Sequence, residues 1–196
     1  MKSVKGTQTE KNLLAAFAGE SQARNRYTFS ASQARKEGYI QIAEIFEETA
    51  NQEKEHAKRF FTYLDGGEVE IHAGYPAGFE AEGAVSNTAE NLKHAAEGER
   101  MEWTTLYTGF ADVAKEEGFP EIAAQFNAVC VAEKQHEKRY NKLRENLLDG
   151  SVFKREPETV WACLNCGYVF VGAEPPKMCP ACKHPQGYFE LVRENW

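Results

Sequence analysis

Two tetrapeptides of the form Glu-x-x-His stand 80 residues apart in this chain of 196 residues: Glu53-Lys54-Glu55-His56 and Glu133-Lys134-Gln135-His136. Residues three positions apart on a helix lie close to one another, so both side chains of each copy can reach one metal ion. Two such pairs, each joined by a glutamate from a preceding helix, form the ligand set of a carboxylate-bridged dinuclear metal site in a four-helix bundle. One copy alone would mean little, because glutamate is common on helix surfaces. Two copies in equivalent positions favour a metal site.

The other carboxylate ligands should come from the helices that precede the two motifs. Glu20 is flanked by small residues that allow close helix approach. Glu99 and Glu102 share a helix face, whereas Glu97 lies about 200° round the helix from Glu99 and is assigned to the surface. Five carboxylates and two imidazoles suit iron or manganese. The predicted catalytic metal ligands are Glu20, Glu53, His56, Glu99, Glu102, Glu133 and His136.

The first half of the chain predicts two helices and a long crossover. The first helix starts at a capping-box sequence, Thr7-Gln8-Thr9-Glu10, and ends before Gly38. The second runs from near Tyr39 to residues 65–67. Residues 67–86 contain several glycines and no helical period, which makes this connection too long for an antiparallel hairpin. It leaves open whether the helices pair within one chain or exchange between subunits.

The second half predicts two more helices, the third from Asn87 to Glu117 and the fourth from Pro120 to Asp149. Helix, short turn, helix, long crossover, helix, short turn, helix is the connectivity of the ferritin-like bundle. The halves are also a repeat, because residues 37–61 align without a gap onto 117–141. We interpret this as a gene duplication that places two metal-binding faces opposite each other.

The repeat is broken at one ligand position. Glu20 aligns with Glu99, but Glu102 aligns with Ala23, so one half carries a surplus carboxylate. Oxidation of two ferrous ions adds two positive charges, and an anionic ligand then matches the metal better than a neutral imidazole. Our hypothesis is that Glu102 and His56 compete for one iron, with histidine bound in the reduced state and glutamate in the oxidised state.

Two tyrosines are candidates for a place beside the metals. Tyr27 follows Glu20 by seven residues, and Tyr107 follows Glu102 by five. Their phenols would orient a bound peroxide or a carboxylate, and we include Tyr27 among the predicted catalytic residues. Packing in an aromatic core is the alternative for both. Cys130 stands among apolar residues and is interpreted as a small buried hydrophobe.

The last 46 residues, 151–196, differ in character from the predicted bundle of residues 1–150. They are rich in proline and in aromatic and β-branched residues, and too short for a large core. Two Cys-x-x-Cys pairs separated by twelve residues predict a tetrahedral four-thiolate site, with ligands Cys163, Cys166, Cys179 and Cys182. Zinc and iron both accept four sulfurs. The aromatic residues around the pairs favour iron, because burial tunes a redox centre.

The composition narrows the possible partners. A net charge of −7 argues against nucleic acid or an anionic membrane as the main partner. No apolar run approaches the length of a membrane span, and residues 1–6 lack the apolar core of a signal peptide. Four of the five cysteines form close pairs, which is more typical of metal binding than of disulfides. We therefore expect a cytoplasmic protein.

The whole chain resembles the rubrerythrin family. The segment Gly19-Glu20-Ser21-Gln22-Ala23-Arg24-Asn25-Arg26-Tyr27 looks like its first-helix signature, and the two Glu-x-x-His copies with Glu99 and Glu102 match its diiron ligands. The cysteine tail looks like its rubredoxin domain. The resemblance implies a mainly α protein, with a ferritin-like four-helix bundle and a small C-terminal rubredoxin-like β/loop domain.

The resemblance also implies an activity. An Fe(Cys)4 centre would pass electrons to a non-haem diiron peroxidase that reduces hydrogen peroxide to water in oxidative-stress defence. It implies a homodimer in which one chain's rubredoxin-like domain lies near the other chain's diiron site. The electrons would come from NAD(P)H through a partner reductase, directly or through a separate rubredoxin, because the chain has no Gly-x-Gly-x-x-Gly fingerprint for binding that cofactor itself.

Two other functions use the same residues. A ferritin-like ferroxidase or iron-handling protein would have these ligands and use dioxygen, although iron storage does not need a fused electron inlet. A zinc-ribbon interaction protein would use the bundle only as a partner surface. The metal content and the preferred oxidant separate these alternatives.

Overall fold

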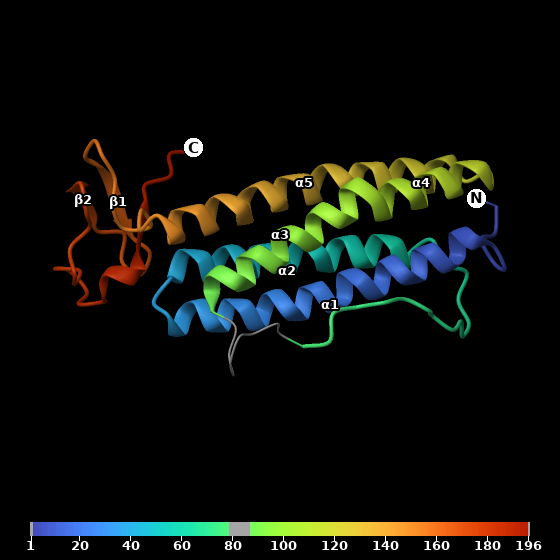
Figure 1. The fold of residues 1–196 in the computed structure, drawn as a ribbon, viewed down its shortest axis with the longest axis horizontal. Helices are drawn as coiled ribbons and strands as arrows, with labels where there is room; N and C mark the ends of the chain where they lie inside the picture. The colour runs from blue at the N-terminus through green and yellow to red at the C-terminus, as the bar shows by residue number, and fades with distance from the viewer. Residues whose placement is uncertain (1, 79–86, 196) are drawn as a thin grey trace.

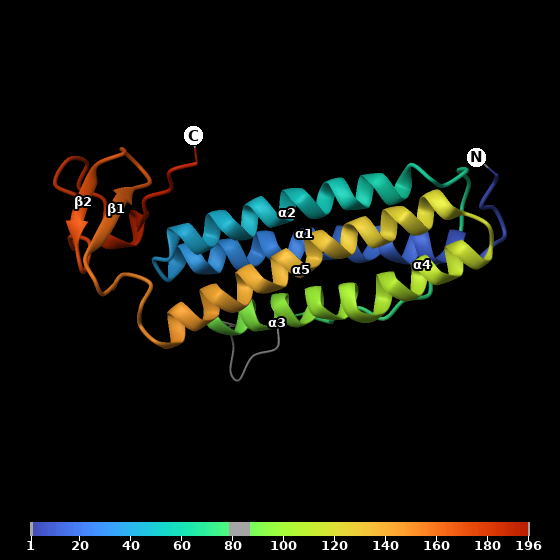
Figure 2. The same cartoon turned by 90° about the horizontal axis from the view of Figure 1, so that it is seen from above.

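The computed structural model describes residues 2–78 and 87–195 and has the predicted mainly α fold (Figures 1 and 2). The bundle is built from α1 (Gln8–Lys36), α2 (Ile40–Phe61), α3 (Thr88–Met101), α4 (Tyr107–Glu116) and α5 (Pro120–Leu148). Helices α3 and α4 form one continuous rod, joined by a short π-helix, η1 (Glu102–Leu106). Helices α1 and α2 pair along one side, and α5 packs against α3 and α4 on the other.

The helix ends follow local chemistry. The side chain of Thr7 accepts a hydrogen bond from the Glu10 backbone at the start of α1, and Asn87 does the same for Glu90 at the start of α3. Gly38 after α1 and Gly118 after α4 both have positive φ, as residues just past a helix end often do, and the predicted termination of the first helix before Gly38 is confirmed.

Two predicted helix descriptions were wrong in detail. The second helix ends at Phe61 rather than at residues 65–67, because the last residues form a turn with shorter-range hydrogen bonds. The third helix is not a continuous α-helix, since η1 interrupts it. A π-turn has no signature in hydrophobic periodicity, so the pattern could not reveal it.

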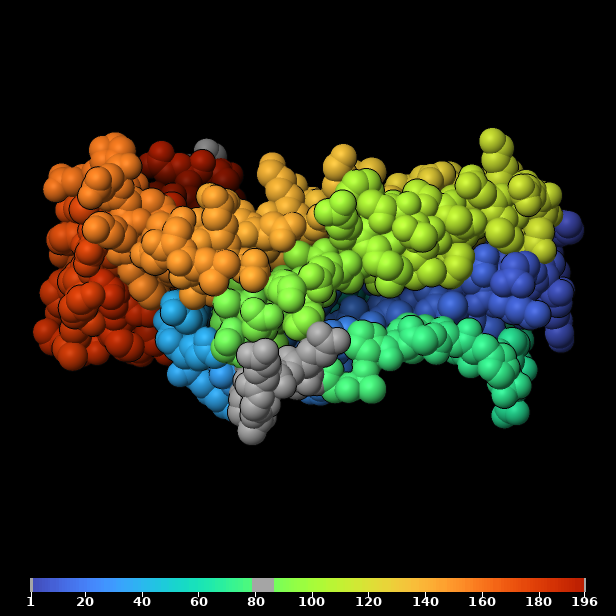
Figure 3. All heavy atoms as spheres, viewed as in Figure 1, coloured from blue at the N-terminus to red at the C-terminus, as the bar shows by residue number. Residues whose placement is uncertain are grey.

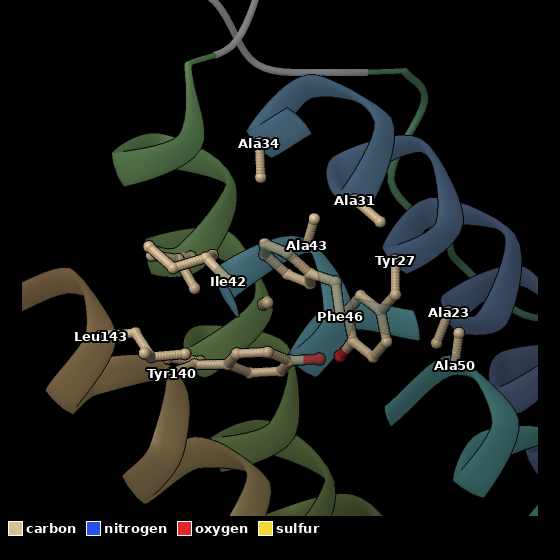
Figure 4. Packing of buried hydrophobic residues seen from close by; sticks show 13 residues of the cluster. Ala23, Tyr27, Ala31, Ala34, Ile42, Ala43, Phe46, Ala50, Tyr140 and Leu143 are labelled. Carbon is tan, nitrogen blue, oxygen red and sulfur yellow. The ribbon is translucent and has the colours of Figure 1, made fainter. Parts of the chain in front are cut away.

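The buried core has an apolar cluster toward each end of the bundle. One contains Phe46 and Tyr140, which lie between the helices in Figure 4, and the other contains Phe60 and Phe126. A fully buried side chain of this size stabilises the fold by roughly 1.5–3 kcal/mol relative to its exposed state. Because close apolar packing lies on both sides of the polar centre of the bundle, the distances between the helices at that centre are fixed.

The described part of the crossover, residues 67–78, lies along α1 (Figure 1). Residues 67–78 run over the bundle surface, below the α3–η1–α4 rod in Figure 3. Tyr75 attaches this segment to the bundle, because its phenol donates a hydrogen bond to the Ala15 carbonyl over 2.6 Å. The remainder of the predicted crossover, residues 79–86, lies outside the described residues.

The C-terminal module is a three-stranded antiparallel sheet in the order β2-β1-β3, built from β1 (Thr159–Cys163), β2 (Val169–Gly172) and β3 (Phe189–Leu191). It packs at the end of the bundle that is remote from the N-terminus (Figure 1). Gln41 on α2 donates a hydrogen bond to Glu190. Gly187 fits against the backbone of Gly38 so closely that an added Cβ would stand 2.1 Å from the Gly38 carbonyl oxygen.

Candidate metal centres

The bundle brings six of the seven predicted bundle ligands into two adjoining groups. One group holds Glu20, Glu53, His56 and Glu133; the other holds Glu53, Glu99, Glu133 and His136. In each group the potential ligand atoms lie within 4.8 Å of one another. Glu53 and Glu133 belong to both groups, so their carboxylates are placed to bridge two neighbouring metal ions. Each ion would then have one further glutamate and one histidine of its own.

Both histidines lie in short contact with the two shared glutamates. His56 Nδ1 lies 2.8 Å from Glu53 Oε2 and 3.0 Å from Glu133 Oε1. His136 Nδ1 lies 2.8 Å from Glu133 Oε2 and 3.1 Å from Glu53 Oε1. Each imidazole therefore turns the same ring nitrogen toward both shared glutamates. Two bridging carboxylates between two metal ions are typical of diiron and dimanganese bundles.

The buried polar atoms of this centre fit bound cations. Oxygens of Glu20, Glu53, Glu99 and Glu133, together with His136 Nδ1, are fully buried and, apart from the close contacts between these glutamates and the two histidines, have no partner among the described residues. Burial, and then repulsion between neighbouring carboxylates, raises the pKa of Glu20, Glu99 and Glu102 well above its usual range. Burying this many carboxylates without a cation is costly, and bound metal ions supply the missing positive charge.

The histidines respond to the same carboxylates. Burial alone would lower the pKa of His56, but hydrogen bonds with Glu133 and Glu53 outweigh it and raise the pKa to about 10. The same balance raises the pKa of His136 to about 12. A metal ligand must be the neutral imidazole, so metal ions take the place of these protons when they bind.

Two buried tyrosines donate hydrogen bonds to the terminal carboxylates across the bundle. Tyr27 on α1 donates to Glu99 on α3, and Tyr107 on α4 donates to Glu20 on α1 over 2.7 Å. Burial, followed by nearby glutamates, raises the pKa of both phenols well above its usual range, so both remain protonated donors. Both tyrosines also pack against aromatic rings of the core. Each therefore combines aromatic packing with a hydrogen bond to a glutamate of the candidate metal centre.

Glu102 occupies the first position of the π-helix and lies outside both four-residue groups. Its side chain is nevertheless buried, and it is close enough to Glu99 and Glu133 for their charges to raise its pKa. The π-helix accounts for an irregularity in the repeat: Glu99 follows Glu20 by 79 residues, whereas Tyr107 follows Tyr27 by 80. The extra residue is absorbed in η1. The change of offset from 79 to 80 residues between Glu99 and Tyr107 is the feature of the sequence that could have located the π-helix.

Sequence reasoning missed Gln52. Its Oε1 atom lies 2.9 Å from His136 Nε2. An amide oxygen only accepts hydrogen bonds, so the imidazole donates its Nε2 proton and keeps Nδ1 for the metal side. The equivalent position in the other half of the repeat is Ala132, which has no such acceptor. The difference between Gln52 and Ala132 at equivalent positions of the repeat was the feature of the sequence that could have indicated a special role for Gln52.

The predicted cysteine site also comes together. Cys163, Cys166, Cys179 and Cys182 offer four sulfur atoms within 4.8 Å of one another, with Cys163 and Cys182 at 3.7 Å and Cys166 and Cys179 at 3.7 Å. A hydrogen bond from the His184 backbone, followed by side-chain hydrogen bonds, lowers the pKa of Cys182 to about 6. Four convergent thiols with an available thiolate form a tetrahedral metal site.

The other predicted residues lie where the sequence placed them. Glu97 is exposed on α3 and pairs with His94 at 3.5 Å. Cys130 is half-buried on α5 and packs against the apolar cluster that contains Phe126. No helix in the described part of the chain has the length and apolar character needed to cross a membrane.

Known proteins resemble this chain over its full length. A family model described as Rubrerythrin matches residues 11–144, and one described as Rubrerythrin, rubredoxin-like domain, matches residues 161–190. A rubrerythrin of Porphyromonas gingivalis is 58% identical over 100% of this chain and 95% of its own length. A rubrerythrin of Nitratidesulfovibrio vulgaris is 53% identical over 100% of both chains.

A solved structure supports the same assignment. The fully reduced, all-ferrous state of nigerythrin aligns with a TM-score of 0.62 and 29% identity over 97% of this chain and 92% of that one. The bundle is therefore ferritin-like, with a diiron site, and the C-terminal module is rubredoxin-like, with four cysteines positioned to bind iron. With family models covering both parts and close relatives over the whole length, the chain belongs to the rubrerythrin family of oxidoreductases.

Proposed function

We propose that this protein is a non-haem diiron peroxidase that reduces hydrogen peroxide to water. The observation that carries the proposal is the pair of buried ligand groups sharing Glu53 and Glu133, in a chain that also has a four-cysteine iron site. The first arrangement fits two adjacent iron ions, and the second fits a one-electron carrier. An iron-storage protein has no need for that carrier.

Two ferrous ions at this centre would supply the two electrons for cleavage of the O–O bond and act as Lewis acids on the oxygen. Glu20 and Glu99 would each hold one ion, and the two shared glutamates would keep the ions close together. His56 and His136 would complete the two ligand sets. The ligands Glu20, Glu53, His56, Glu99, Glu102, Glu133 and His136 remain predictions residue by residue.

The two tyrosines would orient the terminal carboxylates of the site. Tyr27 and Tyr107 hold the terminal carboxylates Glu99 and Glu20 in fixed orientations, since each phenol donates to one carboxylate oxygen. That leaves the second oxygen of each carboxylate for the metal side. The raised pKa of both phenols keeps each O–H proton on its oxygen, so that it stays donated to the carboxylate.

The rubredoxin-like module would supply the electrons. One iron in the site of Cys163, Cys166, Cys179 and Cys182 carries one electron, so two transfers restore the diiron centre after each peroxide. We propose residues 1–150 as the diiron domain and 151–196 as the electron-transfer domain. A rubredoxin or an NAD(P)H-dependent reductase would serve as donor, in a cytoplasmic homodimer. The four thiol ligands require a reducing compartment, which supports this location.

The test is oxidation of the anaerobically reduced, iron-loaded protein, followed by visible absorption. The proposal expects faster oxidation by hydrogen peroxide than by dioxygen, and return of the ferric–thiolate colour in the same reaction. Faster oxidation by dioxygen would favour a ferroxidase instead. A colourless protein that holds only zinc after expression in iron-replete cells would support an interaction protein and contradict the proposal.

A further inference from the structure

A cavity of about 640 Å³ lies beside the diiron centre, between α1, the α3–η1–α4 rod and the crossover. Its inner wall includes Gly19, Gly98 and Glu102, and the crossover residues Ile71 and Tyr75 form part of its outer wall. In Figure 3 the crossover follows the bundle surface as a separate band below the rod. Because Glu102 is both a predicted iron ligand and a wall residue, the cavity reaches the metal site.

Two helical glycines keep this space open. Gly19 immediately precedes Glu20 and Gly98 immediately precedes Glu99, so the two glycines are equivalent in the repeat. A glycine inside a helix destabilises it by roughly 0.5–1 kcal/mol relative to alanine. Neither glycine has a positive φ.

Close packing does not require glycine at these positions either. A Cβ added to Gly98 would meet no heavy atom within 4 Å, and one added to Gly19 would meet only Tyr75 Cε1 at 3.7 Å. At Gly187 in the rubredoxin-like domain, in contrast, a Cβ would collide with backbone. What the two helical glycines provide is open volume in the cavity that Glu102 also lines.

The cavity wall combines apolar side chains with polar and charged ones, among them Lys11 and Arg26. Ile71, Leu106 and Phe110 give it apolar surface, whereas the buried carboxylate of Glu102 lies at the inner end. The phenol of Tyr75 is engaged by the Ala15 carbonyl, so it holds the crossover in place with its ring toward Gly19. A ligand that fits has a polar end for the metal site and an apolar remainder.

The cavity is much larger than hydrogen peroxide needs, and its size is that of a site for an organic molecule. A water molecule takes about 30 Å³ in the liquid, and pockets for organic ligands are typically about 300–1,000 Å³. We propose that this cavity is the entry and binding site for organic hydroperoxides, with the –OOH group at the Glu102 end and the alkyl group against Ile71 and Phe110. This inference rests on the proposed peroxidase function and extends its substrate class.

The reaction balances with the electrons that the proposed function already provides. The O–O bond of ROOH would break with uptake of two protons from solvent and of two electrons, which two bound ferrous ions would supply. The products are the alcohol ROH and one water molecule. Hydrogen peroxide is the case in which R is a hydrogen atom.

The test compares Gly98→Leu with Gly109→Leu in the full, iron-loaded chain. Gly109 is also helical, its added Cβ would also meet nothing within 4 Å, and it does not line the cavity. We expect Gly98→Leu to slow oxidation of the reduced protein by tert-butyl hydroperoxide more than about tenfold, the scale on which a filled pocket discriminates. Oxidation by hydrogen peroxide should change much less. The smaller Gly98→Ala should be intermediate, and Gly109→Leu should match the wild type with both oxidants.

A second measurement does not depend on turnover. In zinc-substituted, ¹⁵N-labelled protein, tert-butyl hydroperoxide should shift the amide resonances of Gly19, Gly98 and Ile71, and Gly98→Leu should abolish these shifts. Absence of the shifts in the wild type, or equal slowing with both oxidants in Gly98→Leu, would overturn the inference. Failure of hydrogen peroxide to oxidise the wild-type protein would instead overturn the proposed function, so the two failures are distinguishable.

Discussion

Gln52 and His136 are joined by a hydrogen bond of 2.9 Å from the imidazole Nε2 to the amide oxygen. His56 occupies the equivalent place in the other half, where Ala132 stands instead of a glutamine. The His136 side chain is 5% exposed and that of His56 is 17% exposed. One histidine of the pair is therefore anchored on both ring nitrogens, and the other is anchored on one. This asymmetry agrees with the hypothesis that His56, and not His136, is the ligand that exchanges with Glu102.

Replacement of Gln52 by alanine should weaken metal binding at the diiron centre by about 10–100-fold, because loss of an outer partner frees the imidazole that it orients. The measurement is anaerobic competition between the protein and a ferrous chelator. Gln135→Ala is the matched control, since Gln135 lies inside the second Glu-x-x-His motif but is exposed. Equal affinities of Gln52→Ala and the wild type would show that the hydrogen bond does not support the ligand.

Replacement of Glu102 by alanine should raise the reduction potential of the diiron centre. An anionic ligand stabilises the ferric state more than the ferrous state, so its loss favours reduction, by about 59 mV for each tenfold change in that preference. A redox titration followed by visible absorption measures the shift. Glu97→Ala is the control, because Glu97 is an exposed glutamate on the preceding turn.

Structures of the two oxidation states test the exchange itself. We expect His56 to be bound in the diferrous protein and Glu102 to be bound in the diferric protein. The same ligands in the diferrous and the diferric protein would contradict the hypothesis, whatever the reduction potential of the diiron centre in the Glu102→Ala variant.

Replacement of Cys163 by serine should unfold the rubredoxin-like domain and leave the bundle helical. The apolar cluster of this domain is small, with Trp161, Cys163, Cys179 and Phe189 as its buried members, so metal binding has to supply much of the folding free energy. Loss of the ferric–thiolate absorption and of near-ultraviolet circular dichroism, with unchanged far-ultraviolet helix signal, is the expected result. Cys130→Ser should keep the absorption. An ordered domain in metal-free Cys163→Ser would refute this dependence.

Glu117 stabilises the start of α1 from the far end of α4. Its carboxylate accepts hydrogen bonds from the Gln8 backbone at 3.0 Å and from the Thr9 backbone at 2.7 Å. The Thr9 hydroxyl is the main cause of the lowered pKa of this carboxyl. A pKa lowered by folding stabilises the protein above the unfolded value of 4.5, and this contribution is lost as the pH falls through the folded pKa.

Glu117→Gln should therefore lower the free energy of unfolding by about 0.3–1 kcal/mol at pH 7, the usual effect of a charge at a helix terminus. The difference from the wild type should shrink below pH 4.5 in urea unfolding. Glu116→Gln, an exposed neighbour with the same loss of charge, controls for net charge and for metal loss at low pH. A difference that persists unchanged at pH 4 would show that the carboxylate charge is not responsible.

Much of the fold, and most of the residues that come together at the two candidate metal centres, could be predicted from local pattern. Glu53 and His56 lie three residues apart on one helix, and the Cys-x-x-Cys pairs are short enough to converge wherever the domain packs. Gly38 ended a helix where its position predicted. The interruption of the third helix could not be predicted, because a π-turn leaves the apolar spacing almost unchanged. Gln52 was also inconspicuous, because its partner stands 84 residues away.

The sequence by itself determined the types of ligand, their pairing on helix faces, the duplication and the attached cysteine site. These depend on contacts within a few residues, where the helical rise and rotation are known in advance. The tertiary structure alone decided that Glu53 and Glu133 are shared by both groups, that Tyr27 and Tyr107 bond across the bundle, and that a cavity opens beside Glu102. Each depends on how four helices and a crossover pack together, and packing is set by the side chains of all of them at once.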